Sequence, residues 1–196
     1  MRNAFWISGG AGGNASTLAS RVQRIDGVTL SDDEAARAKQ FCREVFVHNL
    51  EEGLPPGTQP PYDVVLASHV LEHICFPGKL LRDVAAQLSP EGILIVALPN
   101  LMKYKKRFPL VRGKFEYADG GIMDNTHFRW YTFETGRRLL ESHGFSVIRA
   151  YASGHFPLPF IRRLLPGSLQ RWIGNCATKM SPGFFGVQLI YVARRA

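Results

Sequence analysis

A run of small residues, from Ser8 to Gly13, directly follows the apolar residues 4–7 and is the first feature of the chain with a chemical use. Glycines let a ligand approach the backbone closely, and a helix beginning at Asn14 would turn its free N–H groups towards that ligand. The same kind of turn also joins elements without binding anything, and dinucleotide enzymes use it too. The turn alone therefore does not choose between these uses.

Two later segments place histidines beside carboxylates, a combination that suits proton transfer. Glu72 and His73 follow a continuous apolar run, and Asp124 and His127 follow a pair of glycines. Each pair also has a structural interpretation. Glu72 and His73 would then orient a loop, and Asp124 would form an ion pair with Arg129 while His127 packs the loop. The spacing leaves both interpretations open.

Positive charge is concentrated in one segment between residues 103 and 114, with aromatic residues among the cations. The chain carries 24 Lys and Arg against 16 Asp and Glu, a formal net charge of +8. Such an excess favours anionic partners: a phosphate or carboxylate on a small ligand, or the headgroups of a membrane touched peripherally. A solvated basic loop is the alternative. Nucleic acid is not favoured, because no recognised binding module is present. The cations of this segment are Lys103, Lys105, Lys106, Arg107, Arg112 and Lys114.

Strand and helix patterns alternate along the chain. Helices are predicted over 14–24, 31–43, 77–88 and 132–144, with Ser31 and Glu34 as a capping box. This alternation predicts an α/β fold, in which ligands lie beyond the carboxyl ends of parallel strands. The predicted strands are residues 4–7, 27–30, 45–48, 63–67, 93–98, 145–151 and 187–193.

Bulk composition limits the class of protein. The 196 residues fit a single domain, with a core over 4–151 and an extension containing the last strand over 152–196. No apolar run approaches the roughly 20 residues that span a bilayer. Cys42, Cys75 and Cys176 are scattered without metal-ligand spacing, which predicts free thiols, no metal site and a cytoplasmic location.

Several segments together resemble a known family. Tyr62 to His73 (YDVVLASHVLEH) resembles the fourth-strand motif of class I S-adenosylmethionine-dependent methyltransferases, and residues 88–100 resemble their next strand. Residues 113–117 and 121–130 are similar to the MetW-like branch, methyltransferase types 11 and 23. The resemblance implies a Rossmann-like, open, mostly parallel seven-stranded sheet with helices on both faces and an antiparallel last strand.

The resemblance also implies S-adenosylmethionine as the cofactor, with departures at the acidic positions. Trp6, or Ser8 in a register two residues later, stands where strand one usually ends in an acid, and neither is a carboxylate. Thr29 stands where an acid binds the ribose hydroxyls. Asn49 replaces an aspartate near the adenine, where an amide oxygen can still accept a hydrogen bond. A lost ribose carboxylate removes bonds of about 1.5–3 kcal/mol each, which predicts weaker cofactor binding. The implied cofactor residues are Ser8, Gly10, Gly12, Thr29, Leu30, Asn49, Leu50, Ser68 and His69.

The implied function is methyl transfer to a small-molecule or glycan-like acceptor, at oxygen, with His127 as the base and Asp124 beside it. Trp6 and Thr29 favour an alternative, a catalytically inactive methyltransferase fold kept as a binding protein. A nucleotide-cofactor oxidoreductase is a third hypothesis, against which the segments 69–73 and 121–124 argue.

Overall fold

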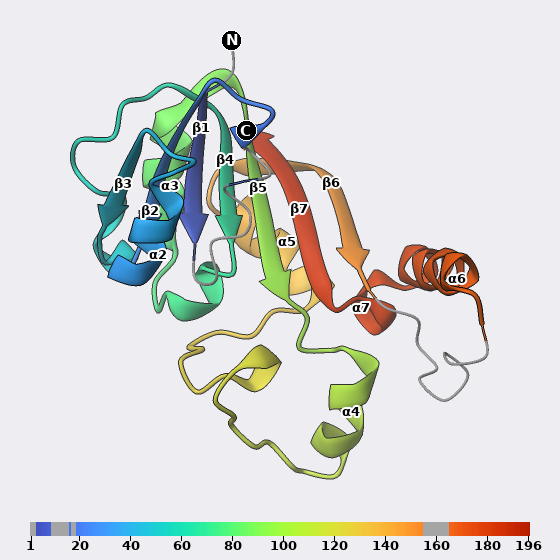
Figure 1. The fold of residues 1–196 in the computed structure, drawn as a ribbon. Coiled ribbons are helices and arrows are strands. Elements are labelled where there is room, and N and C mark those ends of the chain that lie inside the picture. Colours follow the sequence, from blue (N-terminus) through green and yellow to red (C-terminus); the bar gives the residue numbers. More distant parts are fainter. Residues whose placement is uncertain (1–2, 9–15, 17–18, 155–164) are drawn as a thin grey trace.

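The computed structural model describes residues 3–8, 16, 19–154 and 165–196, and only the backbone of 104–106. Seven strands form one sheet whose C-terminal edge faces a long excursion of the chain (Figure 1). The predicted strands are all present, with some bounds shifted. They are β1 (Asn3–Ser8), β2 (Arg24–Thr29), β3 (Glu44–Val47), β4 (Tyr62–Ser68), β5 (Leu88–Pro99), β6 (Phe145–Ser153) and β7 (Gln188–Arg195).

The strand order is β3-β2-β1-β4-β5-β7-β6. The strands from β3 to β5 pair in parallel, whereas β7 runs antiparallel to both of its neighbours, β5 and β6. The predicted fold class, a Rossmann-like sheet with an antiparallel last strand, is confirmed. The order reverses at β1 and β4, so the switch point where such sheets bind ligands lies between these two strands.

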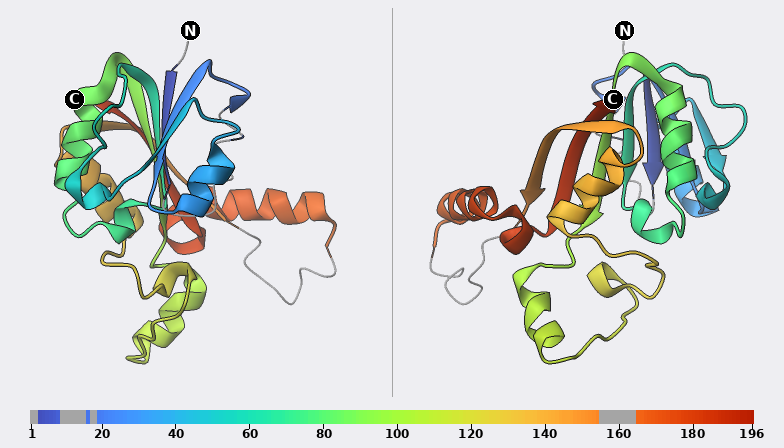
Figure 2. Two further views of the ribbon diagram at one scale, coloured as in Figure 1. Left: turned by 60° about the vertical axis from the view of Figure 1, so that its left-hand side comes forward. Right: turned by 180° about the vertical axis from the view of Figure 1, so that it is seen from behind.

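The helices cover both faces of this sheet (Figure 2). α3 and α5 lie on one face and α2 on the other, while α4 lies beyond the carboxyl edge. Thr132 caps α5 with a capping box, as the helix predicted from 132 requires. The helices are α2 (Asp32–Ala38), α3 (Gly78–Gln87), α4 (Tyr104–Val111), α5 (Phe133–Glu141), α6 (Gly167–Met180) and α7 (Pro182–Phe185), with short 3-10 turns η1 (Leu50–Glu52), η2 (Leu71–His73) and η3 (Gly121–Met123). Within the described residues no helix is long and apolar enough to cross a membrane.

The two faces of β1 belong to two cores, because side chains alternate along a strand. Phe5 and Ile7 pack into the main core beneath α3 and α5. Trp6 is fully buried in the smaller core, where Ala38 of α2 and Cys42 also lie. The indole of Trp6 is therefore a packing element under α2.

Some predicted boundaries are wrong. The helix expected over 14–24 lies partly outside the described residues, and Arg24 already begins β2. β5 starts at Leu88 rather than Ile93, because Leu88 already pairs with Tyr62 of β4. The pairing resumes at Val64 and Ile93, so the predicted turn at 90–92 is an irregularity within the strand. The basic segment after β5, considered as a loop, contains helix α4, with Pro109 inside it.

Cys42 is the one buried thiol among the three free cysteines. Burial, and secondarily the charge of Asp26, raise the pKa of Cys42 to about 11. At pH 8 only about one such thiol in a thousand is ionised, against about one in four for an ordinary thiol. We expect iodoacetamide to label Cys75 and Cys176 in the folded protein and to spare Cys42 until urea is added, as read by peptide mass spectrometry. Equal labelling rates for all three thiols in the folded state would contradict this.

Candidate active site

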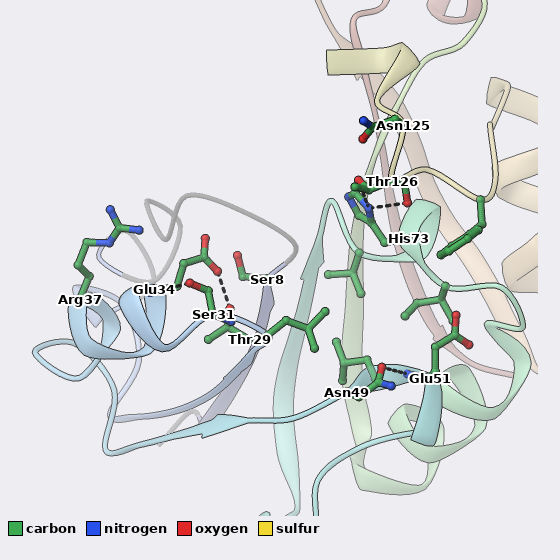
Figure 3. A pocket seen from close by; sticks show the side chains of 15 residues that line it. Ser8, Thr29, Ser31, Glu34, Arg37, Asn49, Glu51, His73, Asn125 and Thr126 are labelled. Carbon is green, nitrogen blue, oxygen red and sulfur yellow. Dashed lines mark hydrogen bonds between the residues drawn. The ribbon is translucent and has the colours of Figure 1, made fainter. Parts of the chain in front are cut away.

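A pocket with a volume of about 750 Å³ opens at the carboxyl edge of the sheet, beside the switch point. That is within the usual range for sites that bind a cofactor-sized molecule. Figure 3 shows its labelled polar side chains in three groups. One comes from the ends of β1 and β2 and from α2, one from the turn after β3, and one from η2 and the loop before α5. The described residues that line it are Ser8, Thr29, Leu30, Ser31, Glu34, Arg37, Asn49, Leu50, Glu51, Val70, His73, Ile74, Asn125, Thr126 and Phe128.

Five of the nine predicted cofactor residues line this pocket: Ser8, Thr29, Leu30, Asn49 and Leu50. They meet there because each directly follows, or ends, one of the parallel strands β1, β2 and β3. Gly10 and Gly12 lie outside the described residues. Ser68 is buried at the end of β4 without lining the pocket, and His69 faces a second pocket described below.

Glu34 is one of the pocket residues that were not predicted as cofactor residues, and it is the buried carboxylate among them. Its Oε2 accepts a hydrogen bond of 2.5 Å from the Thr29 hydroxyl, and that hydroxyl accepts one from the Ser31 backbone N–H at 3.2 Å. The predicted capping box is only half formed: Ser31 Oγ accepts from the Glu34 N–H, whereas the Glu34 carboxylate turns away to Thr29. A carboxylate thus lies next to the position where the sequence has lost one.

Asn49 occupies the far end of the same pocket and caps the turn η1. Its Oδ1 accepts a hydrogen bond from the Glu51 N–H at 3.1 Å. An amide oxygen has two lone pairs, so it retains capacity to accept from an adenine amino group. Leu50, the next residue, is buried and presents an apolar surface at this end.

A second pocket, of about 370 Å³, adjoins the first, and His73 lines both. It lies between the end of β4, the end of β5, the loop that carries η3, and the start of β7. Its lining combines three imidazole rings with two carboxylates. The residues are His69, Glu72, His73, Pro99, Gly121, Ile122, Asp124, His127, Val187 and Gln188.

His127 lies in this second pocket, 8% exposed, but its orienting partner is not Asp124. Its Nδ1 bonds the Ile122 carbonyl at 3.2 Å, and because a carbonyl can only accept, Nδ1 carries the proton and Nε2 is left as a base. Asp124 instead accepts from the N–H and hydroxyl of Thr126, and these bonds hold its pKa below the usual value. The alternative ion pair does not form either, since Arg129 donates to the Cys75 carbonyl.

His69 and Glu72 form a second polar array in this pocket. His69 Nδ1 lies 3.1 Å from the fully buried Glu72 Oε1, and Gln188 Nε2 lies 2.9 Å from His69 Nε2. His69 has a φ of 54°, the only positive φ of a non-glycine in the described chain. A non-glycine residue keeps a positive φ only where the surrounding structure holds it there, and such residues cluster at functional sites.

Glu72 and His73 also hold the loop above the pocket, as their structural interpretation requires. The Glu72 carbonyl accepts from the N–H groups of Phe128 and Arg129. His73 Nδ1 lies 3.2 Å from the Thr126 carbonyl.

The sequence predicts no metal site. Yet Glu72, His73 and His127 bring one ligand atom each within 4.8 Å of one another, and Glu72 Oε2 is buried without a hydrogen-bond partner in the described chain. By donor type this set fits a divalent cation.

These features place the chain in one class of protein. It is a doubly wound α/β domain with a nucleotide-sized pocket at the switch point, and a second pocket lined by histidines and carboxylates lies beside it. Residues 7–150 match the family model described as a methyltransferase domain, so the chain belongs to the methyltransferase domain family. The predicted class, which uses S-adenosylmethionine as its cofactor, is confirmed. Membership of the MetW-like branch stays a prediction.

Curated relatives include two enzymes named ubiquinone biosynthesis O-methyltransferase. The one from Caulobacter sp. (strain K31) is 35% identical over 130 residues, covering 60% of this chain and 49% of the relative. The one from Rhodopseudomonas palustris (strain HaA2) is 36% identical over 94 residues, covering 47% of this chain and 36% of the relative. The chain spans about half the length, or less, of these relatives.

Solved structures show the same fold at low identity. A SAM-dependent methyltransferase from Archaeoglobus fulgidus matches with a TM-score of 0.64 and 20% identity, over 99% of this chain and 86% of that one. The O-methyltransferase of a Brevibacillus brevis trans-AT PKS multienzyme, in complex with S-adenosyl-L-homocysteine, matches with a TM-score of 0.57 and 16% identity, over 100% and 67%.

Proposed function

We propose that this chain transfers a methyl group from S-adenosylmethionine to an oxygen of a small or glycan-like acceptor that carries negative charge. The observation that supports this most is the pair of adjoining pockets, which share His73 as a common wall. The larger pocket takes the cofactor and the smaller one takes the acceptor. The names of the two O-methyltransferase relatives support oxygen as the acceptor atom. The net charge of +8 supports an acceptor whose negative charge lies outside the smaller pocket, because that pocket is itself lined by Glu72 and Asp124.

The cofactor supplies a methyl group already activated on a sulfonium, so the protein has mainly to align the acceptor and to remove its proton. Asn49 and Leu50 would hold the adenine, Thr29 and Leu30 the ribose, and Ser8 the methionine part. The predicted roles of Gly10 and Gly12 fall on residues outside the described ones. Ser68 and His69, at the end of β4, position the reacting end.

His127 Nε2 would take the proton of the acceptor hydroxyl. The oxygen of that hydroxyl would bond to the methyl carbon as the bond between this carbon and sulfur breaks. The electron pair of the broken bond would stay on sulfur, which would give S-adenosylhomocysteine as the second product. The Asp124 carboxylate shapes the loop through Thr126, and the Asp124 carbonyl accepts the backbone N–H of His127.

The binding half of this proposal is tested by calorimetric titration with S-adenosylhomocysteine. We expect saturable binding in the micromolar range, because the pocket has the size and the polar ends that the ligand needs, and no binding of NADH at the same concentration. No detectable heat at millimolar S-adenosylhomocysteine would overturn the proposal and favour the inactive binding protein. The acceptor is then sought by mass spectrometry, with methyl-deuterated cofactor and a panel of phenol carboxylates and sugar acids.

A further inference from the structure

We infer that Glu34, presented by α2 and held by Thr29, is the carboxylate that binds the ribose hydroxyls of the cofactor. The inference rests on the proposed function and names the residue that performs one of its steps. The end of β2, where an acid is expected, carries the hydroxyl of Thr29 instead. The sequence considered by itself therefore predicts a weakened ribose site.

The position of Glu34 carries the first step. It is 7% exposed and lines the 750 Å³ pocket together with Ser8, Thr29 and Ser31. In Figure 3 these four side chains lie together at one end of the pocket, with Asn49 well separated from them. With the adenine at Asn49 and the ribose at Thr29, as proposed above, the Glu34 carboxylate would lie beside the ribose, because it is bonded to the Thr29 hydroxyl.

The second step is the direction of the hydrogen bonds. The Thr29 hydroxyl accepts from the Ser31 N–H and so directs its own proton to Glu34 Oε2. This bond fixes one oxygen of the carboxylate. No described residue donates a hydrogen bond to the other oxygen, Oε1, which leaves it available to a ligand hydroxyl.

The third step is the cost of burying this group. A buried carboxylate is ordinarily paired with a cation, because removal of a charge from water is unfavourable. Within the described part of the chain no lysine, arginine or histidine lies within ion-pair distance of Glu34, and the capping interaction expected of its carboxylate is not made. A buried carboxylate that has no cation beside it is stabilised by hydrogen bonds from a ligand. The two hydroxyls of a ribose can donate such bonds.

The inference is tested with Glu34→Gln, which keeps the shape and one acceptor oxygen but removes the charge. We expect affinity for S-adenosylhomocysteine to fall about ten- to a hundredfold, the effect of losing one charge-assisted hydrogen bond. Asp33→Asn is the matched control, since it removes the same charge from the same turn of α2 at an exposed position outside the pocket. It should bind within twofold of the parent.

Two further measurements separate ribose recognition from a structural role. The 2′-deoxyribose analogue of S-adenosylhomocysteine should bind the parent at least tenfold more weakly than the ribose form, whereas Glu34→Gln should bind the two ligands almost equally. Thr29→Asp combined with Glu34→Gln moves the carboxylate back onto the end of β2 and should recover most of the affinity. If Glu34→Gln does not fold, Thr29→Val, which removes the hydroxyl that holds the carboxylate, should still reduce the discrimination.

The outcomes distinguish the two hypotheses. If the parent gives no heat with S-adenosylhomocysteine, the proposed function fails and this inference fails with it. If the parent binds, and Glu34→Gln binds equally tightly or still discriminates fully between the ribose and deoxyribose ligands, only the role of Glu34 is overturned.

Discussion

Replacing His127 by Gln is expected to lower the rate of methyl transfer by about 10²–10⁴-fold, the usual effect of losing a general base. Gln has no group that can take a proton at neutral pH, although its volume is close to that of His. Affinity for S-adenosylhomocysteine should stay within twofold of the parent, because His127 lines the second pocket and not the cofactor pocket. The rate is measured with the acceptor found by mass spectrometry, and binding by calorimetry.

His143→Gln is the matched control for this variant. His143 Nδ1 also lies within hydrogen-bond distance of a backbone carbonyl, that of Leu139, but at the end of α5 and outside both pockets. Asp124→Asn should change the rate less than tenfold, since the Asp124 carboxylate bonds Thr126. Unchanged turnover in His127→Gln would assign the proton transfer to another group and leave His127 a packing role.

The sheet could be predicted from the sequence because its strands are short apolar runs that end at prolines, glycines or polar residues. Residues 63–67 and 93–98 show this pattern, and both lie in the observed strands β4 and β5. The boundaries were less predictable. Leu88 begins β5 because it pairs with Tyr62 across an irregular ladder, and this contact between separate elements has no signature in the local pattern.

The candidate site was predictable where residues follow strands and not where they come from elsewhere. The pattern of strands is enough to place Thr29 and Asn49, which lie at or just after strand ends, and the motif after β5 is enough to place His127. Glu34 was assigned to a cap, since a glutamate three residues after a serine is typical of a capping box. Its carboxylate prefers the nearby Thr29 hydroxyl, a choice that depends on how α2 packs against β2. A similar reason applies to the side-chain partner of His127: Asp124 is close in sequence and its carbonyl accepts the His127 backbone N–H at 3.1 Å, but the imidazole bonds the Ile122 carbonyl.

A buried polar cluster lies near the amino ends of β2 and β4, outside both pockets. We expect it to contribute to stability and not to ligand binding. Asp26 is fully buried on β2, and its carboxylate accepts from Arg43 Nε at 2.9 Å and from the Tyr62 hydroxyl at 2.8 Å. Burial and the bond to Asp26 raise the pKa of Tyr62 to about 12. Because the pKa is raised in the folded state, the contribution of Tyr62 is intact below about pH 10 and is lost as the pH rises towards 12.

Asp26→Ala should therefore lower the free energy of unfolding by about 3 kcal/mol, near the lower end of the range for breaking a buried ionic cluster. The lower end applies because the two arginines paired with Asp26, Arg43 and Arg24, have side chains 40% and 25% exposed and can turn to water, whereas the Tyr62 hydroxyl stays buried without an acceptor. For a chain of this length that corresponds to a fall in Tm of about 6–12 °C by calorimetry.

The exposed change Asp33→Asn is the control for this variant and should shift Tm by less than about 2 °C. Asp26 and Tyr62 line neither pocket, so folded Asp26→Ala should bind S-adenosylhomocysteine like the parent. A fall in affinity without a fall in Tm would instead mean that this cluster positions the cofactor edge of the sheet.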